Sequence, residues 1–172
     1  MDYSFLMTEL QKIALFDETK EALESQGFSI QSQDQNRPWG GFFVLAEGQI
    51  NKFIDLFFDK LNMGQINLSG KLSPKILVVA PNKRLSWQYH NRRAELWRVV
   101  QGEVEVVTSV TDEETDSRTL GPGEYITLKQ GERHRLIGLN DWGVVAEIWQ
   151  HTDPLNPSDE EDIVRVQDDF GR

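Results

Sequence analysis

Hydrophobic positions along the chain follow two different periods, and the change falls near residue 75. In 1–27 and again in 50–61, apolar residues recur three and four positions apart, which is the spacing of one helix face. From residue 75 onward, short apolar runs are separated by turn residues, which is typical of strands. The pattern predicts an N-terminal helix ending near Gly27, a second helix over 50–61, and a β domain.

The predicted strands are short, and turns rich in glycine, proline and asparagine separate them; they cover 39–45, 75–80, 84–90, 95–100, 104–108, 118–120, 125–129, 134–138, 144–149 and 163–166. Many short strands at this spacing favour a sandwich or barrel over a parallel α/β fold. We place a helical extension and a polar linker, 31–36, within 1–36, and the β domain at 37–172. Inside that domain, 50–61 is an inserted helix that packs outside the sheet or against another subunit, and 150–172 is a polar tail.

Composition and charge narrow the class of protein. The chain has 172 residues, of which 38% are hydrophobic, enough for one domain with its own core. A net charge of −10 argues against nucleic acid or an anionic membrane as the main partner, whereas a small phosphorylated ligand needs only a few local Arg or Lys side chains. The sequence shows no membrane-spanning run and no export signal, so we expect a cytoplasmic protein. We interpret the acidic runs 112–114 and 159–162 as solvated loops.

Side chains of the types that bind metal ions gather in the β domain. Gln88 and His90 share one face of a predicted strand, because side chains two apart point the same way. Glu95 opens the next strand after a polar reversal, and His134 follows about forty residues later. Two imidazoles, a carboxylate and an amide oxygen suit one divalent ion such as Zn, Mn, Fe, Ni or Co. The alternative is a buried polar network that is satisfied without a metal.

These residues resemble the two motifs of the cupin family. The patterns G-x5-H-x-H-x4-E-x6-G and G-x5-P-x-G-x2-H-x3-N are met over 82–102 and 123–138. The resemblance implies an all-β cupin double-stranded β-helix, which is a jelly-roll barrel, with the four side chains above as ligands of one divalent metal ion. Four positions depart from the motifs: Asn82 for Gly, Gln88 for His, Lys129 for Pro and Gly138 for Asn.

The Gln at the first ligand position resembles the type II phosphomannose isomerase subgroup of cupins. Two further segments are similar to that subgroup, namely 37–40 (RPWG) and the end of the chain, with 161–165 (EDIVR) followed by 168–172 (DDFGR). The resemblance covers about 37–172 and is interrupted by the inserted helix. The subgroup run reads approximately S-x-Q-x-H-x-x-R-x-E-x-W, which is met here by Ser86, Gln88, His90, Arg93, Glu95 and Trp97.

This resemblance implies an aldose–ketose isomerase that converts mannose 6-phosphate to fructose 6-phosphate through an enediol. Lys75 matches a family lysine, and Glu147 lies in a segment similar to the family's I-E-V-Q, so both are catalytic candidates for proton transfer. The family's tail folds over the barrel mouth, which would bring Arg165 and Arg172 to the site. We take Arg165 as a further catalytic candidate and Arg172 as a ligand of the substrate phosphate.

Strand parity adds two substrate-binding candidates. Arg84 shares parity with Gln88 and His90, and Trp97 shares parity with Glu95. For Arg84, an exposed charge at a strand end is an equally good interpretation. His151 fits neither motif and is interpreted as a surface or tail residue.

Other functions stay open at this point. The isomerase could act on another sugar, for example unphosphorylated lyxose or mannose, and a non-catalytic sugar-binding or sensor cupin is a second alternative. An iron-dependent dioxygenase is a weaker one. We expect no guanylyltransferase activity, because the chain contains no Gly-rich phosphate loop and has no room for such a domain. By analogy with other cupins, we expect a homodimer that binds a small sugar or sugar phosphate.

Overall fold

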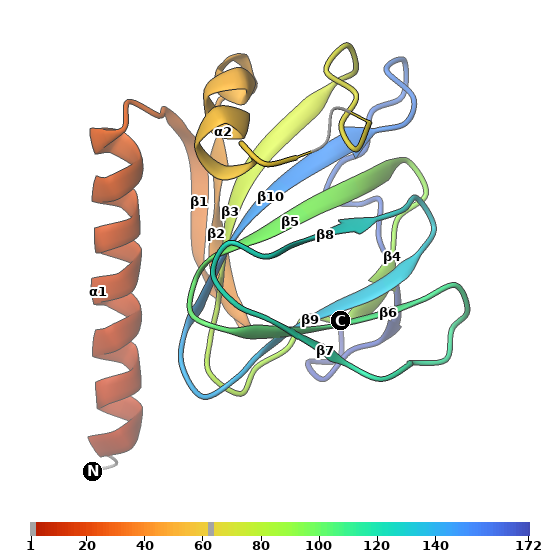
Figure 1. Cartoon of the computed structure of the whole chain (residues 1–172). Coiled ribbons are helices and arrows are strands. Elements are labelled where there is room, and N and C mark those ends of the chain that lie inside the picture. Colours follow the sequence, from red (N-terminus) through yellow and green to blue (C-terminus); the bar gives the residue numbers. More distant parts are fainter. Residues whose placement is uncertain (1–2, 62–63) are drawn as a thin grey trace.

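The computed structural model describes residues 3–61 and 64–172, which form two antiparallel sheets with helices on one side (Figure 1). The larger sheet has the order β1-β2-β3-β10-β5-β8 and the smaller has the order β11-β4-β9-β6-β7. The elements are α1 Tyr3–Ser25, β1 Ile30–Arg37, β2 Gly40–Leu45, η1 Glu47–Gln49, α2 Ile50–Phe57, β3 Leu72–Val79, β4 Trp87–Tyr89, β5 Arg93–Gln101, β6 Val104–Ser109, β7 Arg118–Leu120, β8 Tyr125–Leu128, β9 Arg133–Gly138, β10 Gly143–His151 and β11 Val164–Gln167.

The strands from β3 onward pass back and forth between the two sheets. β3, β5, β8 and β10 belong to the larger sheet, whereas β4, β6, β7, β9 and β11 belong to the smaller one. The two sheets face each other and enclose a layer of buried side chains, as a double-sheet jelly roll does. The all-β cupin barrel implied by the sequence resemblance is therefore confirmed.

Most predicted strands have a counterpart, but two predictions need correction. The polar linker predicted at 31–36 is wrong, because this segment is strand β1 and pairs with β2, for example at Ser32 and Val44. β1 is an edge strand held by backbone hydrogen bonds, so it needs no continuous apolar face and its sequence stays polar. The strand predicted at 84–90 shrinks to β4, and Arg84 keeps only an isolated bridge to Ile137.

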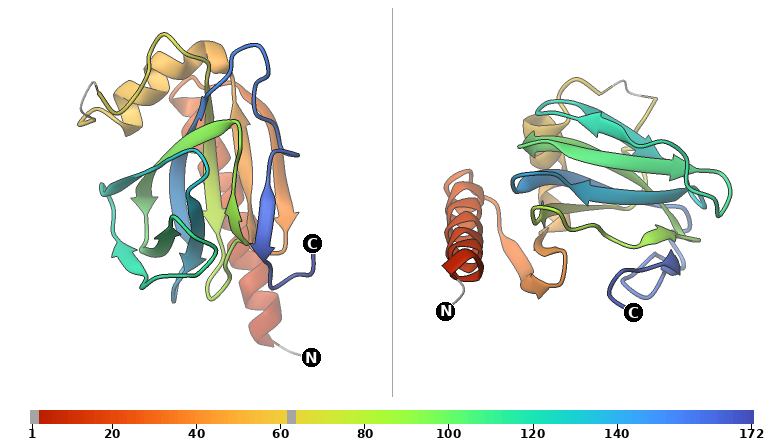
Figure 2. Two further views of the ribbon diagram at one scale, coloured as in Figure 1. Left: turned by 90° about the vertical axis from the view of Figure 1, so that its right-hand side faces the viewer. Right: turned by 90° about the horizontal axis from the view of Figure 1, so that it is seen from below.

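The two helices lie on the outer side of the larger sheet (Figure 2). α1 ends at Ser25, and Gly27 closes it with a φ of +83°, as predicted; residues 1–2 of the predicted helix lie outside the described residues. α2 ends at Phe57 and not at 61, because a turn follows at 59–60. Its buried Phe53 packs in the cluster that covers the sheet. No helix among the described residues is long and apolar enough to cross a membrane.

Two turn residues explain why the first motif keeps its spacing despite a substitution. Gly102 has a φ of +75°, and a Cβ atom there would lie 2.4 Å from the backbone oxygen of Trp142, so only glycine fits. Asn82 stands where the motif has its first glycine and also adopts a positive φ of 57°. Asparagine tolerates this left-handed conformation better than most residues, so the exchange preserves the turn that precedes β4.

Candidate active site

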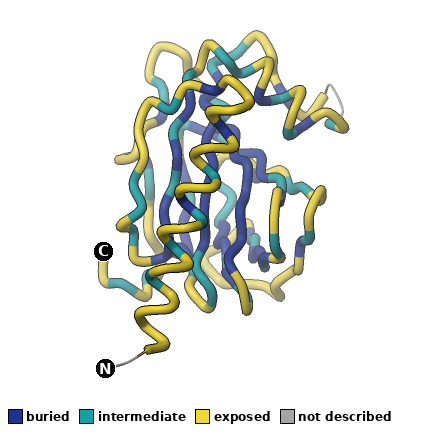
Figure 3. The backbone as a smooth tube through the Cα atoms, turned by 90° about the vertical axis from the view of Figure 1, so that its left-hand side faces the viewer, coloured by how far each residue is buried: buried dark blue, intermediate teal, exposed yellow. Residues whose placement is uncertain are grey.

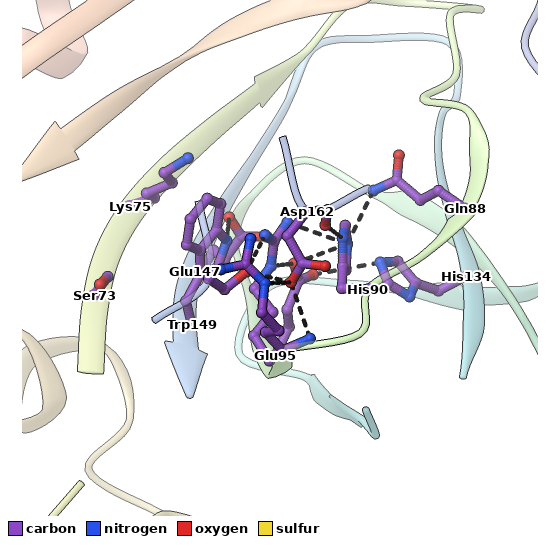
Figure 4. A network of polar contacts seen from close by, with 12 residues as sticks. Ser73, Lys75, Gln88, His90, Glu95, His134, Glu147, Trp149 and Asp162 are labelled. Atoms are coloured by element: carbon purple, nitrogen blue, oxygen red, sulfur yellow. Dashed lines mark hydrogen bonds and ion pairs between the residues drawn. The ribbon is translucent and has the colours of Figure 1, made fainter. Parts of the chain in front are cut away.

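Three of the predicted metal ligands converge inside the barrel (Figure 4). His90 follows β4, Glu95 lies on β5 and His134 lies on β9, so three separate strands contribute one side chain each. One ligand atom from each residue lies within 4.8 Å of the other two, and all three residues are buried. The two sequence motifs therefore pointed to side chains that lie together in the structure, although Glu95 and His134 are nearly forty positions apart.

Each imidazole is oriented by a backbone carbonyl. Nδ1 of His90 lies 2.7 Å from the carbonyl oxygen of Asp162, and Nδ1 of His134 lies 3.0 Å from that of Glu132. A carbonyl can only accept, so Nδ1 carries the proton in both rings and each Nε2 presents a lone pair to the cluster. Burial lowers the pKa of His90 to about 4, although the charge of Glu95 opposes this, so His90 is neutral at pH 7.

Glu95 lies between the two imidazoles and leaves one acceptor unused. Its Oε1 is 3.2 Å from Nε2 of His90, and its Oε2 is 3.4 Å from Nε2 of His134. Burial by itself raises the pKa of Glu95, but His90 and Arg93 outweigh it and hold the pKa well below its usual range. Among the described residues, Oε2 of Glu95 and Nε2 of His134 are buried without any hydrogen-bond partner.

Two orphaned acceptors aimed at one point are what a divalent cation would satisfy, because an unpaired buried acceptor is costly. Two neutral imidazole nitrogens and one carboxylate oxygen form a donor set typical of first-row metals. The residues present therefore fit a metal ion, and His90, Glu95 and His134 could hold it.

Gln88, the fourth predicted ligand, lies beside the cluster but does not present its oxygen to it. Its Oε1 accepts a hydrogen bond from Ser86 Oγ at 2.6 Å, and its Nε2 lies 3.5 Å from Nε2 of His90. A half-turn of the amide would exchange the two atoms, and the amide nitrogen could then donate to the Ser86 hydroxyl. The role of Gln88 as a ligand stays a prediction.

A pocket of about 80 Å³ opens next to Glu95 and places several of the predicted residues together. Arg84 is not among the lining residues, because its guanidinium is paired with Asp169 at 2.7 and 2.9 Å. The candidates that line the pocket are Lys75, Trp97, Glu147, Arg165 and Arg172, together with Gln88 and Glu95 of the ligand set.

Glu147 is a second buried acid in this pocket, beside Glu95. Its two oxygens accept hydrogen bonds from the indole nitrogens of Trp97 at 2.6 Å and Trp149 at 2.9 Å. Burial, and then the negative charge of Glu95, raises the pKa of Glu147 to about 8. Lys75 lies on the neighbouring strand, with its Nζ 3.8 Å from the centre of the Trp149 ring and paired with Glu160 of the tail.

Arginine side chains gather at the end of the pocket nearest the tail. Arg37, Arg165 and Arg172 all line it. Burial, and then the positive charges of Arg172 and of Arg37, lowers the pKa of Arg165, which shows that the three guanidinium groups act on one another. Arg37 is paired with Asp34 and Arg172 with Asp168, so a ligand with more than one negative charge would compete with these carboxylates for the guanidinium groups.

Sequence reasoning gave no role to Arg93, although the structure places it at the centre of the site. Its Nε donates to Glu95 at 2.8 Å, its Nη2 lies 3.2 Å from Nε2 of His90, and its guanidinium stacks 3.6 Å from the Trp149 ring centre. Arg93 stands two positions before Glu95 on β5, so the same parity rule could have found it.

The interpretation of 159–162 as a solvated loop needs correction for its last residue. Asp162 is buried against the site. The carboxylate of Asp162 accepts hydrogen bonds from the backbone of Asn91 and Arg92, and its carbonyl oxygen orients His90. The sequence offers no signal for this contact, since about seventy residues separate the partners.

His151 joins the tail to the sheet and has no place in the cluster. Its Nδ1 accepts a hydrogen bond from the backbone nitrogen of Ser158 at 2.9 Å, so its Nε2 donates to Ser73 Oγ at 2.7 Å. Ser73 in turn donates to Glu47 at 2.6 Å. The imidazole is a donor toward the hydroxyl, so this chain of contacts is structural and does not activate Ser73 as a nucleophile.

Residues 58–168 match the protein family described as mannose-6-phosphate isomerase C-terminal. The alginate biosynthesis protein AlgA of Pseudomonas aeruginosa is 31% identical over 155 residues, which is 87% of this chain and 26% of AlgA. The xanthan biosynthesis protein XanB of Xanthomonas campestris is 32% identical over 136 residues, which is 79% of this chain and 23% of XanB. The chain thus spans about a quarter of the length of these curated relatives.

Solved structures that superpose on this chain share its barrel. Oxalate decarboxylase from Bacillus subtilis gives a TM-score of 0.57 at 13% identity, covering 80% of this chain and 31% of the other. KdgF from Halomonas sp. gives 0.51 at 14% identity, covering 76% of this chain and 92% of the other. At these identities the likeness concerns the fold alone.

Proposed function

The chain belongs to the mannose-6-phosphate isomerase C-terminal family, and on that basis we propose that it is a metal-dependent aldose–ketose isomerase with mannose 6-phosphate and fructose 6-phosphate as its substrate pair. The observation that carries the proposal is the convergence of His90, Glu95 and His134, two of them with orphaned acceptor atoms, beside a pocket lined by cations.

The metal-binding part of the proposal follows from the orientation of the imidazoles. A divalent cation held by His90, Glu95 and His134, with Gln88 as a candidate fourth ligand, would polarise the sugar oxygens at C1 and C2. Arg93 donates toward the same Nε2 lone pair of His90, so its guanidinium and a cation compete for that position. Asp162 keeps the His90 ring in the tautomer that leaves this lone pair free.

Glu147 is our candidate for proton transfer. Isomerisation moves a proton from C2 of the aldose to C1 of the ketose, so one group must take up the proton and return it. A carboxyl group whose pKa is raised to about 8 can do both near neutral pH. Lys75 is the second candidate, because its ammonium group lines the same pocket and stabilises negative charge near the sugar.

The phosphate would bind at the arginine-rich end of the pocket. Arg165, Arg172 and Arg37 come from the tail and from β1, so they lie at the mouth and not on the strands that carry the ligand set. A volume of about 80 Å³ is far below the ~300–1,000 Å³ of typical small-molecule pockets. The pair formed by Lys75 and Glu160 must therefore separate before a hexose phosphate enters.

Metal analysis combined with an isomerisation assay tests this proposal. We expect about one divalent ion per chain, turnover of mannose 6-phosphate, loss of turnover on chelation, and recovery when metal is added back. Glu95→Gln should lose the metal and the activity, whereas Glu103→Gln, which changes an exposed turn residue, should keep both.

A panel of aldoses with and without phosphate decides between the alternatives. Metal-loaded protein that binds these sugars and turns over none of them would contradict the isomerase and favour a sugar-binding role. Equal turnover of unphosphorylated mannose or lyxose, with an unchanged KM in Arg165→Ala and Arg172→Ala, would contradict the phosphate assignment.

A further inference from the structure

The first half of α1 exposes large apolar side chains that nothing in the described chain covers. Tyr3 is 72% exposed, Leu6 44%, Leu10 51% and Ile13 48%. The helix is anchored only in its second half, through the buried Phe16 and Leu23 that pack on the body of the protein. Figure 3 shows the helix running along the outside with most of its length exposed.

These four residues lie on one stripe of the helix. Their spacing of three, four and three positions is that of the apolar seam in a coiled coil. The next seam positions are occupied by Asp17 and Lys20, so the apolar stripe ends where the body begins to cover the helix. We call Tyr3, Leu6, Leu10 and Ile13 the seam.

The seams of two copies are complementary when the two helices pair antiparallel. In an antiparallel pair centred near Thr8, Leu6 of one copy lies opposite Leu10 of the other, and Tyr3 lies opposite Ile13. Asp17 of each copy then passes beyond Tyr3 of the other. In a parallel pair, Asp17 would face its own equivalent along the continued seam, which like charges disfavour.

The exposed area is adequate for such a contact. Met7, which is 55% exposed, flanks the seam, whereas Phe5 lies on another side of the helix. At roughly 200 Å² for a fully exposed large side chain, the seam and Met7 leave on the order of 500 Å² accessible, so two copies together could bury about the ~1,000 Å² that a specific interface needs. This is at the upper end of the largest apolar patch of a typical monomer, about 300–600 Å², which is often functional.

We propose that α1 is a self-association element, and that its seam pairs antiparallel with the seam of a second copy of this chain. The contact lies outside the barrel and uses no residue of the site. The inference is therefore independent of the isomerase proposal. It gives the predicted homodimer a defined surface.

Sedimentation or light scattering of the 172-residue chain over a range of concentrations tests the assembly. We expect a dimer for the wild type and a monomer for the double variant Leu6→Glu, Leu10→Glu. Val110→Glu is the matched control, because Val110 is 84% exposed far from α1, and it should stay dimeric. Circular dichroism should show all three folded. A monomeric wild type, or a dimer that survives the double variant, would overturn the proposal.

Disulfide trapping tests the orientation, and the chain has no native cysteine to confuse it. In the antiparallel pair, residues 3 and 13 of different copies meet, whereas like positions lie about 15 Å apart at 1.5 Å per residue. Because a disulfide needs Cα atoms within about 7 Å, a mixture of Tyr3→Cys and Ile13→Cys should cross-link and neither variant alone should. Cross-linking of Tyr3→Cys with itself would show a parallel pair and contradict this arrangement.

Discussion

The two faces of the larger sheet are built from alternate residues of the same strands. The outer face packs against the helices, and the inner face lines the candidate site. The outer face is mostly apolar and is covered by Phe16 of α1 and Phe53 of α2, with Arg98 as a charged exception that donates to the backbone of α2. The inner face carries ionisable groups among tryptophans. Outer residues are Ile76, Val78, Leu96, Val144, Ala146 and Ile148, and inner ones are Lys75, Glu95, Trp97, Glu147 and Trp149.

This contrast teaches where to look for chemistry in a strand that is buried on both faces. Every residue of β3 is buried, so its sequence is mostly apolar and Lys75 is its only charged residue. Glu147 interrupts the run of β10 in the same way. The charged residue lies on the inner face, and the residues before and after it lie on the outer face. Adjacent positions of one strand therefore contribute to the candidate site and to the hydrophobic core.

The largest effect should come from changing the inner face at Glu147. We expect Glu147→Gln to lower kcat by about 10²- to 10⁴-fold, because the group proposed to carry the proton is removed; the amide oxygen can still accept from only one of the two indole N–H groups. Metal content should not change. Steady-state kinetics with metal analysis checks this. If Lys75→Met lost activity to this extent and Glu147→Gln did not, the proton-transfer role would belong to Lys75.

Changing the outer face should affect stability and leave the site intact. Phe53 is fully buried, and its ring packs against Phe28, Phe57 and Phe58 at centroid distances of 4.8–6.1 Å. We expect Phe53→Ala to lower the free energy of unfolding by about 3–5 kcal/mol. Denaturant unfolding measures this, with Phe53→Leu as the milder control. A loss of metal binding in folded Phe53→Ala protein would show that the faces are not independent.

The last expected effect appears only within a window of pH and distinguishes the two faces there. The pKa of Glu147 is raised to about 8 from a usual value of 4.5, so the unfolded chain releases this proton at lower pH than the folded chain does. Between these two values, rising pH therefore lowers the stability of the metal-free protein relative to Glu147→Gln. The difference in free energy of unfolding between these two proteins should grow across that window. The difference between wild type and Phe53→Ala should stay constant; a pH-independent Glu147→Gln difference would contradict the raised pKa.

The sequence predicts features that depend on patterns within one short segment. It does not predict contacts between segments that are far apart along the chain. Strand parity places Gln88 and His90 on one face, and the two motifs point to His90, Glu95 and His134. The barrel follows from the spacing of turns. Strand β1 was missed because an edge strand needs no apolar pattern. The contacts of Asp162 with His90 and of Glu160 with Lys75 were missed because they join segments about seventy and eighty-five residues apart, and no periodicity spans such a distance.

The two indoles that hold Glu147 have a practical consequence. The Trp97 ring centre lies 5.4 Å from that of His134, and the Trp149 ring lies beneath Arg93 and Lys75. Indole emission responds to nearby charge and to open-shell ions, so the protein carries its own fluorescent reporter at the place where a ligand would arrive. Titrating cations or sugar phosphates while recording tryptophan emission would follow occupancy directly, with no label attached.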